Sequence, residues 1–327
     1  MKPIVLVTGG AGYIGAHACK SLALSGLEPV TVDNLTYGHR WAVKWGPLEV
    51  ADIGDHLEIN RIMRKYRPEG VLHFAGNTSV GESMEDPAKY YINNTIKTAV
   101  LLEAMLANRI SNLVFSSTCA TYGVPQVIPI TETHPQNPVN PYGWSKLMAE
   151  IIIKDYTSAY GLKAVSLRYF NAAGADQDGE IGELHHPETH LIPLLLDAAY
   201  GKRPSITVYG TDYETPDGTC IRDYVHVMDL AEAHVKALQW LREKPPGFFA
   251  FNLGNGRGFS VREVTRAVET VTKTRVEVIE GKRRKGDPAV LIGDSRQAEN
   301  ILGWCPRYKD IFQIVQHARN FYGKMSG

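Results

Sequence analysis

The stretch VTGGAGYIG at positions 7–15 carries Gly9, Gly12 and Gly15 at GxxGxxG spacing, between a short apolar run and a segment with helical periodicity. In such a turn the first glycine permits a sharp bend, the second lets the backbone approach a pyrophosphate, and the third lets helix and strand pack closely. The amino end of the helix then offers N–H groups to the anion. Because a purely structural strand–helix turn can also use three glycines, the flanking sequence has to decide between the two interpretations.

Apolar runs and helical patterns alternate outward from this turn. The predicted strands are Ile4–Thr8, Pro29–Asp33, Gly70–Phe74, Asn112–Ser117 and Ala164–Tyr169. The predicted helices between them are Tyr13–Ser25, Asp55–Tyr66, Ala88–Ala107 and Tyr142–Tyr160. The strand runs are nearly continuous, as expected for strands that are covered on both faces. This alternation predicts an α/β fold with a Rossmann-type, doubly wound parallel sheet.

The texture changes after about Asn171, where Gly, Asp, His and Pro crowd Gly174–Pro187. We therefore predict a dinucleotide-binding Rossmann domain at residues 1–170, and a smaller, discontinuous α/β domain for the substrate at residues 171–327. Part of residues 220–245 is expected to return to the first domain. The elements expected after the change are strands at Ile206–Tyr209 and Arg275–Glu280, and helices at Val227–Leu241, Ser260–Val271 and Ile311–Tyr322.

Composition excludes several classes of partner. The 35 basic and 35 acidic side chains cancel, so no long-range field would gather nucleic acid or hold the protein to an anionic membrane. Ile4–Val7 is too short an apolar run for a signal peptide or a membrane span. Cys19, Cys119, Cys220 and Cys305 form no CxxC pair, which argues against a zinc knuckle or a disulfide framework. These features predict a cytoplasmic protein with reduced thiols.

The second apolar run ends in Asp33, about twenty residues after the glycines. An acidic side chain in this place accepts hydrogen bonds from adenosine ribose hydroxyls and repels a 2′-phosphate, which favours NAD over NADP. Considered alone, Asp33 could equally cap a turn; the glycine turn before it favours the dinucleotide. Asp52, beyond the next short run, either meets the adenine amine or is a simple cap.

Tyr142 and Lys146 form a Tyr-x-x-x-Lys pair at a predicted helix start, so both side chains lie on one face of the helix. A free tyrosine has a pKa of about 10, too high for a base at neutral pH. A neighbouring ammonium and a positive nicotinamide would lower this pKa, so that the phenolate could take a hydroxyl proton while hydride leaves the same carbon. Thr118, at a predicted strand end, would hydrogen-bond the reacting hydroxyl. The plainer alternatives are a helical Tyr–Lys contact and a capping threonine.

At this point the chain resembles the UDP-glucose (UDP-galactose) 4-epimerase family of the extended short-chain dehydrogenase/reductase superfamily. The matching motifs, in chain order, are TGGAGYIG (8–15), DNL (33–35), HFAG (73–76), VGES (80–83), YxxxK (142–146), RYFN (168–171), RDYVHVMD (222–229) and GD (286–287). They extend over nearly the whole chain. The resemblance implies interconversion of UDP-galactose and UDP-glucose through a transient 4-keto sugar, with hydride held by tightly bound NAD and with Tyr142 as the base. It also implies a homodimer built on the helices at Ala88–Ala107 and Tyr142–Tyr160.

The resemblance further implies which residues bind each ligand. Residues expected to hold NAD are Gly9, Gly12, Tyr13, Ile14, Gly15, Asp33, Asn34, Leu35, Asp52, Ile53, Phe74, Ala75, Gly76, Thr78, Asn93, Ser116, Tyr142, Lys146 and Phe170. Residues expected to hold the UDP-sugar are Thr118, Tyr142, Asn171, His190, Leu191, Thr207, Tyr209, Arg222, Arg284 and Asp287. Two positions depart from the family pattern. Thr78 replaces a common lysine, which removes a positive contact to the cofactor, and Leu291 replaces a tyrosine of some members, which would widen the sugar pocket.

Several alternatives stay open. UDP-N-acetylhexosamine and UDP-pentose pairs differ from the hexose pair by only a few methylenes of pocket volume. A nucleotide-sugar 4,6-dehydratase would need carboxylates after Thr118, where this chain has Cys119 and Ala120. A non-catalytic NAD-binding scaffold would not need the intact Thr118, Tyr142 and Lys146.

No metal is predicted. His185, His186, Glu188 and His190 are close in sequence, but Pro187 interrupts the helical spacing that would present them together. A polar loop on the substrate side is the preferred interpretation of this segment.

Overall fold

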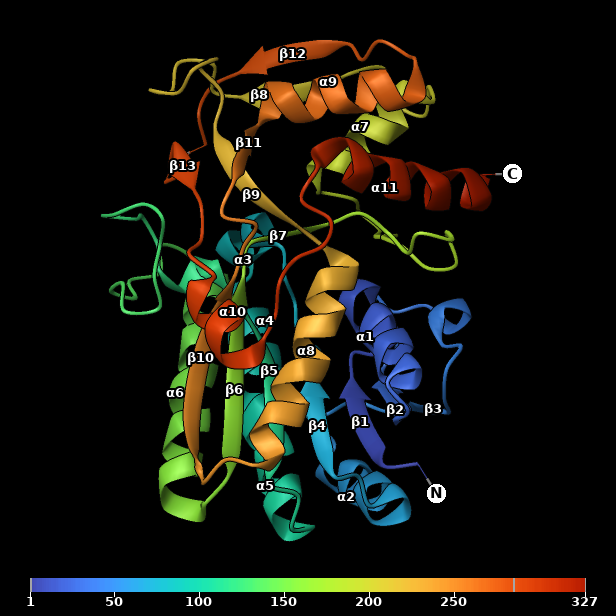
Figure 1. Cartoon of the computed structure of the whole chain (residues 1–327), viewed down its shortest axis with the longest axis vertical. Helices are drawn as coiled ribbons and strands as arrows, with labels where there is room; N and C mark the ends of the chain where they lie inside the picture. The colour runs from blue at the N-terminus through green and yellow to red at the C-terminus, as the bar shows by residue number, and fades with distance from the viewer. Residues whose placement is uncertain (1, 285, 327) are drawn as a thin grey trace.

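A parallel sheet forms the base of the molecule, as Figure 1 shows. The computed structural model describes residues 2–284 and 286–326, and within them seven strands pair in the order β10-β6-β5-β4-β1-β2-β3. Their bounds are β1 Ile4–Thr8, β2 Glu28–Asp33, β3 Leu48–Val50, β4 Gly70–His73, β5 Asn112–Thr118, β6 Lys163–Tyr169 and β10 Gly247–Leu253. Every pairing in this sheet is parallel. The predicted α/β class is confirmed.

Helices cover both faces of the sheet. On one face lie α1 (Tyr13–Leu24) and α8 (Val227–Arg242), and on the other lie α2 (His56–Tyr66), α5 (Lys97–Ala107) and α6 (Pro141–Tyr160). Successive β1 residues point to opposite faces, so Val7 packs in the first apolar core and Leu6 in the second. Because the sheet order changes direction between β1 and β4, a crevice for ligands is expected at the carboxyl ends of these strands.

Residues 87–107 form three successive helical segments instead of the single helix expected at Ala88–Ala107. These are α4 (Pro87–Tyr90), a π-helical segment (Tyr91–Ile96) and α5, and the short α3 (Val80–Glu85) precedes them. The wider π turn keeps the chain helical but shifts its register. Its one fully buried side chain, Asn94, points into the site described below.

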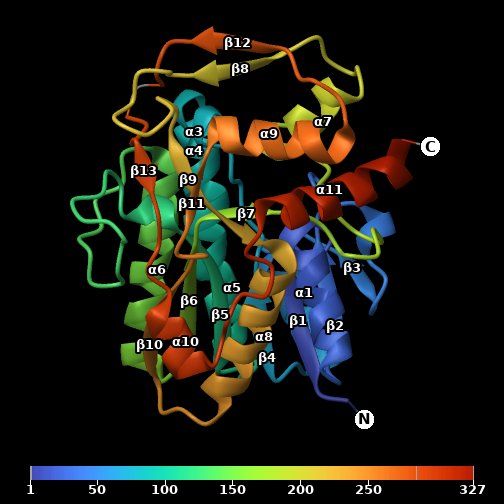
Figure 2. The ribbon, with the colours of Figure 1, turned by 45° about the horizontal axis from the view of Figure 1, so that its top comes forward.

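A second unit closes over the carboxyl end of the sheet (Figures 1 and 2). Its apolar core is built by α7 (Leu191–Ala199), α9 (Val261–Thr272), α11 (Ile311–Ser326) and β8 (Ile206–Tyr209), and β8 pairs in parallel with the largely exposed β12 (Val278–Gly281). A smaller sheet connects the two units, and its strands are β7 (Asn171–Ala173), β9 (Ile221–His226), β11 (Gly258–Ser260) and β13 (Val290–Leu291). The remaining short elements are α10 (Arg296–Leu302) and 3-10 turns at Arg40–Ala42 and Cys119–Thr121.

Two elements from the second half of the chain belong to the large sheet. Helix α8 packs on α1 and on strands β5 and β6, and β10 pairs with β6 along its full length. The sequence prediction returned only part of residues 220–245 to the first domain, and it missed β10 although residues 247–253 form an apolar run. The domain division at residue 170 stays a prediction.

Strand β9 was missed for a different reason. It is almost fully buried yet carries Arg222, Asp223 and His226, so it lacks the apolar run that marked the other strands. Its buried charge is satisfied by distant partners, since Asp223 accepts hydrogen bonds from the backbone N–H groups of Asn255 (2.7 Å) and Gly293 (3.2 Å). Across the described residues, no helix is long and apolar enough to cross a membrane.

Candidate active site

The glycine turn fits a dinucleotide because side chains are sterically excluded from it. Gly9 has a φ of +71°, and a Cβ there would lie 2.6 Å from the backbone nitrogen of Ala75. A Cβ on Gly15 would lie 2.2 Å from the carbonyl oxygen of Gly9. Gly12 is the N-cap of α1, and no side chain among the described residues caps this helix end. The first-turn N–H groups are therefore available to an anion.

Asp33 connects the end of β2 to this turn. Its carboxylate accepts hydrogen bonds from the N–H groups of Ala11 (3.0 Å) and Leu35 (2.8 Å). Burial raises the pKa of this carboxyl group, which these two bonds oppose. Each carboxylate oxygen has further lone pairs, so the group can hold the loop and still accept ribose hydroxyls.

Asp52 lies beside the neighbouring Asn34. It accepts hydrogen bonds from the Asn34 amide (3.1 Å), the Gly54 N–H (2.8 Å) and the Lys97 ammonium (2.6 Å). Burial acts to raise its pKa, but these bonds outweigh burial and hold the pKa below the usual range. The structure thus gives Asp52 a turn bond and a salt bridge, while Asp55 is the N-cap residue of α2. Contact with the adenine stays a prediction.

A chain of buried polar groups fixes the end of β4. The Thr98 hydroxyl donates to the carbonyl oxygen of Asn94 (2.7 Å), so His73 donates from Nε2 to Thr98 (2.9 Å) and accepts at Nδ1 from the Thr8 hydroxyl (2.7 Å). Burial, and then the charge of Lys146, lower the pKa of His73 to about 3. The imidazole is therefore neutral, and it links β1 and β4 at the switch point.

Asn94 holds the segment after Phe74-Ala75-Gly76. It accepts from the Asn77 N–H (2.8 Å) and donates to the Asn77 carbonyl (2.9 Å) and the Ser145 hydroxyl (3.0 Å). Asn93, which the sequence singled out, is only partly buried and donates to Asn94 (3.1 Å). The sequence missed Asn94; its only signal was a polar residue on the inner face of a predicted helix.

Lys146 lies at the carboxyl ends of β4 and β5. Its ammonium donates to the carbonyl oxygen of Ser116 (3.0 Å), and a Cβ on Gly76 would lie 3.1 Å from it. Burial lowers the pKa of Lys146 to about 8, which the charge of Glu150 opposes. A lysine at this edge can reach a ribose only because Gly76 leaves space beside it.

Tyr142 stands one helical turn before Lys146. Burial raises the pKa of the phenol to about 12, and a hydrogen bond with Thr118 opposes this rise. The Lys146 ammonium is directed to the carbonyl oxygen of Ser116, and the lowering of the Tyr142 pKa by this ammonium together with a positive nicotinamide stays a prediction. Thr118 also accepts from the Ala120 N–H (3.1 Å), so its capping role and its contact with Tyr142 coexist.

Glu150 and Arg168 form a buried ion pair (2.6 Å) directly behind these residues. The Glu150 carboxylate also accepts from the hydroxyls of Ser117 (2.5 Å) and Ser166 (2.6 Å). Burial acts to raise the pKa of Glu150, but Arg168 and the two serines hold it below the usual range. The pair joins α6 to β5 and β6, and so fixes the helix that carries Tyr142. Sequence reasoning missed Glu150, although its place four residues after Lys146 was visible.

The other expected cofactor residues lie along the same edge. Phe170 is buried beside Gly293, while Ser116 contacts the Tyr169 phenol. Tyr13 donates to the carbonyl oxygen of Gly174 (2.6 Å) and Ile14 packs against the first core. Ile53 belongs to the second core, and Thr78 is exposed.

The expected substrate residues gather in the second unit. The Arg222 guanidinium pairs with Asp287 (2.5 Å), and the Arg284 guanidinium lies 4.2 Å from the ring centre of Tyr209. Thr207 shares the outer face of β8 with Tyr209. These residues can present two cations and an aromatic face to a nucleoside diphosphate.

Leu291 lies between the charged residues of the second unit and the catalytic residues at the edge of the large sheet. Strand β13 places it opposite Arg222, and its side chain packs beside Cys119 on the buried cluster of Tyr122, Ile130 and Phe170. The charged end and the catalytic edge are therefore connected through this strand.

The remaining substrate residues lie at the other side of the second unit. Asn171 hydrogen-bonds the Tyr224 phenol, and Leu191 begins α7 and packs on the third core. His190, the N-cap residue of α7, pairs with Glu183 (2.9 Å) and Glu188 (3.0 Å). His190 therefore pairs with two glutamates of its own loop, whereas Arg222 pairs with Asp287.

The loop before α7 brings four side chains together. Glu183, His185, Glu188 and His190 each direct one donor atom to a common point, with all four atoms within 4.8 Å of one another. The sequence argument against such convergence rested on Pro187, but an irregular loop achieves it without a helix. Glu183 was missed, and His186, which was considered, is exposed.

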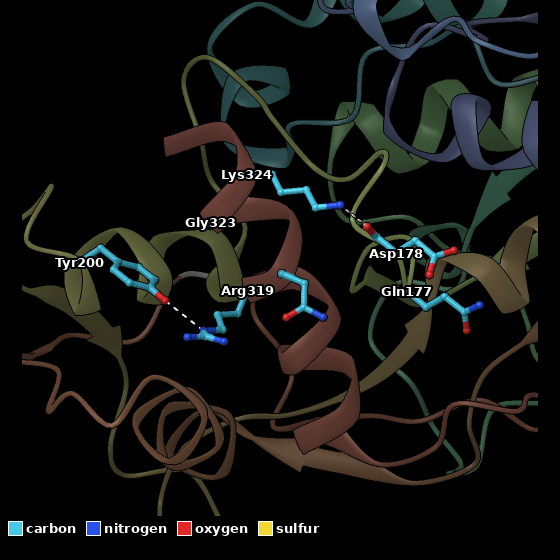
Figure 3. A pocket seen from close by; sticks show the side chains of 7 residues that line it. Gln177, Asp178, Tyr200, Arg319, Gly323 and Lys324 are labelled. Atoms are coloured by element: carbon cyan, nitrogen blue, oxygen red, sulfur yellow. Dashed lines mark hydrogen bonds between the residues drawn. The ribbon is translucent and has the colours of Figure 1, made fainter. Parts of the chain in front are cut away.

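A surface pocket of about 380 Å³ lies elsewhere, at helix α11 (Figure 3). Arg319 donates to the Tyr200 phenol (3.1 Å) and Lys324 donates to the carbonyl oxygen of Asp178. Its lining residues are distinct from those expected to bind ligands. We interpret it as space between α11 and the adjoining loop.

The fold and the residues at the carboxyl ends of β1, β4 and β5 together define a Rossmann-type α/β protein with a Tyr-x-x-x-Lys pair beside its dinucleotide turn. The chain belongs to the NAD dependent epimerase/dehydratase family, whose model matches residues 5–254. The resemblance seen in the sequence is confirmed.

Individual relatives match over nearly the whole chain. A UDP-glucose 4-epimerase from Rhizobium meliloti (strain 1021) is 50% identical over 320 residues, which cover 98% of this chain and 97% of the relative. The crystal structure of UDP-glucose 4-epimerase from Brucella ovis in complex with NAD has a TM-score of 0.95, 52% identity and 98% coverage of both chains. A UDP-glucose-4-epimerase from Stenotrophomonas maltophila with bound NAD and formylated UDP-arabinopyranose has a TM-score of 0.95, 39% identity and 99% coverage of both chains.

Proposed function

We propose that this protein is a UDP-glucose 4-epimerase that interconverts UDP-galactose and UDP-glucose with NAD as its resident cofactor. The observation that carries the proposal is the edge formed by Thr118, Tyr142 and Lys146 beside a glycine turn that excludes side chains. Two UDP-glucose 4-epimerases are 50% and 52% identical to this chain over 98% of its length, which supports the same assignment.

The residues divide into a cofactor side and a sugar side. Backbone N–H groups of α1 would bind the pyrophosphate, Asp33 would accept from the adenosine ribose, and Lys146 would hold the nicotinamide ribose beside Gly76. Bound NAD supplies the acceptor and donor for the C4 hydride, and its positive ring adds to the groups that lower the pKa of Tyr142.

Tyr142 is the acid–base residue. Its phenolate takes the proton of the sugar 4-hydroxyl, while the Thr118 hydroxyl holds the reacting oxygen in place. The sugar would then pass through a 4-keto form, turn about its diphosphate linkage and take back the hydride on the opposite face of C4, while Tyr142 returns the proton to the 4-oxygen. Because burial raises the phenol pKa to about 12, the ionised form is costly unless positive charge lies nearby.

Turning of the sugar requires a firmly held diphosphate and loosely held sugar hydroxyls. Arg222 and Arg284 are placed for the first task, since guanidinium groups bind phosphate oxygens in pairs. The apolar Leu291 suits the second task, because it offers no hydrogen bond that would fix one orientation of the ring.

The test is direct conversion by the purified protein. Incubation with UDP-galactose should yield UDP-glucose, detected by a coupled dehydrogenase, and Tyr142→Phe should lower kcat at least about 100-fold. Tyr90→Phe, which changes the ring packed edge-on at 6.3 Å from Tyr142, is the matched control and should retain most activity. Near-normal turnover by Tyr142→Phe would overturn the assignment of the base, and no conversion by the wild type would favour a non-catalytic scaffold.

UDP-N-acetylhexosamines form a second candidate substrate class. Leu291 is a half-buried aliphatic residue at the junction of the two groups and leaves more room than a tyrosine would. The ligand bound in the Stenotrophomonas structure is a formylated UDP-arabinopyranose, so UDP-pentoses should be tested in the same assay. Parallel kcat/KM values for the three pairs decide among them.

We also propose a homodimer, as expected from the resemblance. Trp144, Met148 and Ile151 form an exposed stripe on α6, and Ile92 and Ile96 are more than half exposed on the π-helical segment beside it. Adjacent exposed apolar side chains of this kind mark an interface. Light scattering after gel filtration should show a dimer that Ile151→Glu weakens, while Ile301→Glu on α10 leaves it intact. A monomeric wild type would contradict the proposal.

A cytoplasmic location is part of the proposal. All four cysteines lie within the described residues and are free thiols, which suits a reducing compartment.

A further inference from the structure

The loop between residues 183 and 190 places two carboxylates and two imidazoles around one point. Glu183 and Glu188 have side chains that are 8% and 13% exposed, so both negative charges are largely removed from water. His185 and His190 face them, and of the four only His190 is also among the residues expected to hold the UDP-sugar. A buried pair of like charges needs a compensating cation.

The distances between the donor atoms match one small ion. Nδ1 of His185 lies 3.4 Å from Glu183 and 3.7 Å from Glu188, while Nδ1 of His190 lies 2.9 Å and 3.0 Å from the same residues. Ligands held about 2.0–2.2 Å from a tetrahedral zinc ion are about 3.3–3.6 Å apart. The two His185 separations lie within about 0.1 Å of this range, the two His190 separations are about 0.3–0.4 Å shorter, and each nitrogen faces both carboxylates.

The residues around the cluster hold the ligands in place. Oε1 of Glu188 accepts hydrogen bonds from the N–H groups of Thr189 (2.7 Å) and His190 (2.8 Å). Nε2 of His39 hydrogen-bonds the carbonyl oxygen of Leu184 (3.0 Å), which fixes the loop between the first two ligands. Such outer contacts orient metal ligands and are expected at a genuine site.

We propose that Glu183, His185, Glu188 and His190 bind a structural zinc ion that fixes the loop before α7. Two imidazoles with two carboxylates favour a borderline divalent ion over magnesium or calcium, which prefer six or more oxygen ligands. Four protein ligands leave no open position, so the ion has a structural role and takes no part in hydride transfer. The edge-on contact of the Tyr13 and His185 rings (centroids 6.4 Å apart) places this clamp beside the helix of the glycine turn.

The experiment measures metal in the tag-free, full-length protein, and it does not depend on epimerase activity. Protein stripped with a chelator and dialysed should take up about one zinc per chain at micromolar free zinc, and its thermal midpoint should rise by a few degrees. Cobalt should replace zinc with the intense visible bands of a four-coordinate ion. Uptake below about 0.2 zinc per chain, weak six-coordinate bands or a preference for magnesium would each overturn the proposal.

Variants separate this site from adventitious binding. His185→Gln and Glu183→Gln should each lower zinc affinity about 10-fold or more, whereas His186→Gln, the exposed neighbour of His185, should leave it unchanged. Equal uptake by all three variants would show an adventitious ion only and would overturn the proposal. The cobalt spectrum of the wild type keeps the test decisive if a variant fails to fold.

Discussion

The edge of the large sheet and the unit that closes over it hold their charges in different ways. At the edge, the side chains of Glu150 and Arg168 are 3% and 6% exposed and bind each other with the neighbouring serines. In the second unit, Asp287 is 27% exposed beside Arg222, and Arg284 lies over a partly exposed tyrosine. The first arrangement is closed and positions the catalytic helix. The second can exchange its partners, as a diphosphate site must.

The largest expected effect is a loss of stability on breaking the buried ion pair of Glu150 and Arg168. Glu150→Gln removes the carboxylate charge and leaves Arg168 buried without its counterion, which costs about 3–5 kcal/mol of stability. Urea unfolding followed by fluorescence measures the loss. Glu58→Gln, whose pair with Arg61 is exposed, is the matched control and should change stability little. Similar losses in the two variants would remove the distinction drawn here.

A smaller effect, dependent on pH, is expected from His234 on α8. Burial lowers the pKa of His234 to about 4, from about 6.5 in the unfolded chain. The unfolded state therefore binds the extra proton between these values, and this histidine reduces stability by about 1.4 kcal/mol per pH unit as pH falls from 6.5 to 4.

The variant His234→Gln isolates this effect. It should be less stable than the wild type at pH 7, because it loses the contact with Phe74 (ring centroids 4.4 Å apart), and the difference should narrow on acidification. Urea midpoints at half-unit pH steps supply the comparison. Parallel curves for the two proteins would show that His234 is not held neutral.

The variant Arg222→Met tests the pair of Arg222 and Asp287 in the second unit. Loss of charge-assisted hydrogen bonds to the diphosphate should raise KM for the UDP-sugar about 10–100-fold, with a smaller change in kcat. Arg262→Met on α9 removes an exposed arginine of the same unit and serves as the control. An unchanged KM in Arg222→Met would place the diphosphate elsewhere.

The smallest effect is expected at Leu291. Leu291→Tyr adds bulk where β13 meets the catalytic edge, and it should lower the ratio of kcat/KM for UDP-N-acetylglucosamine to that for UDP-glucose about 10-fold. The ratio within one variant corrects for any general loss of activity. A constant ratio would show that this side chain does not face the sugar.

The sequence predicted the first half of the fold well, because each strand from β1 to β6 except the short β3 is a buried apolar run. It failed for β9, whose buried charges hide the strand, and for β10, whose apolar run follows the change of texture after Asn171 and was not linked to the first sheet. The ranges of α9 and α11 were close to those observed, because amphipathic periodicity is local.

By itself, the sequence determined the glycine turn and the Tyr142–Lys146 spacing, since each depends on backbone or helix geometry within a few residues. It also determined the family, because the matching motifs extend over nearly the whole chain. Only the tertiary structure decided which charges meet. Arg222 reaches Asp287 across 65 residues, and Glu150 reaches Arg168 across 18. Burial by distant elements also raises the Tyr142 pKa, which the spacing of Tyr142 and Lys146 in the sequence does not indicate. Spacing in sequence reports local geometry, whereas desolvation and ion pairing depend on everything that packs around a group.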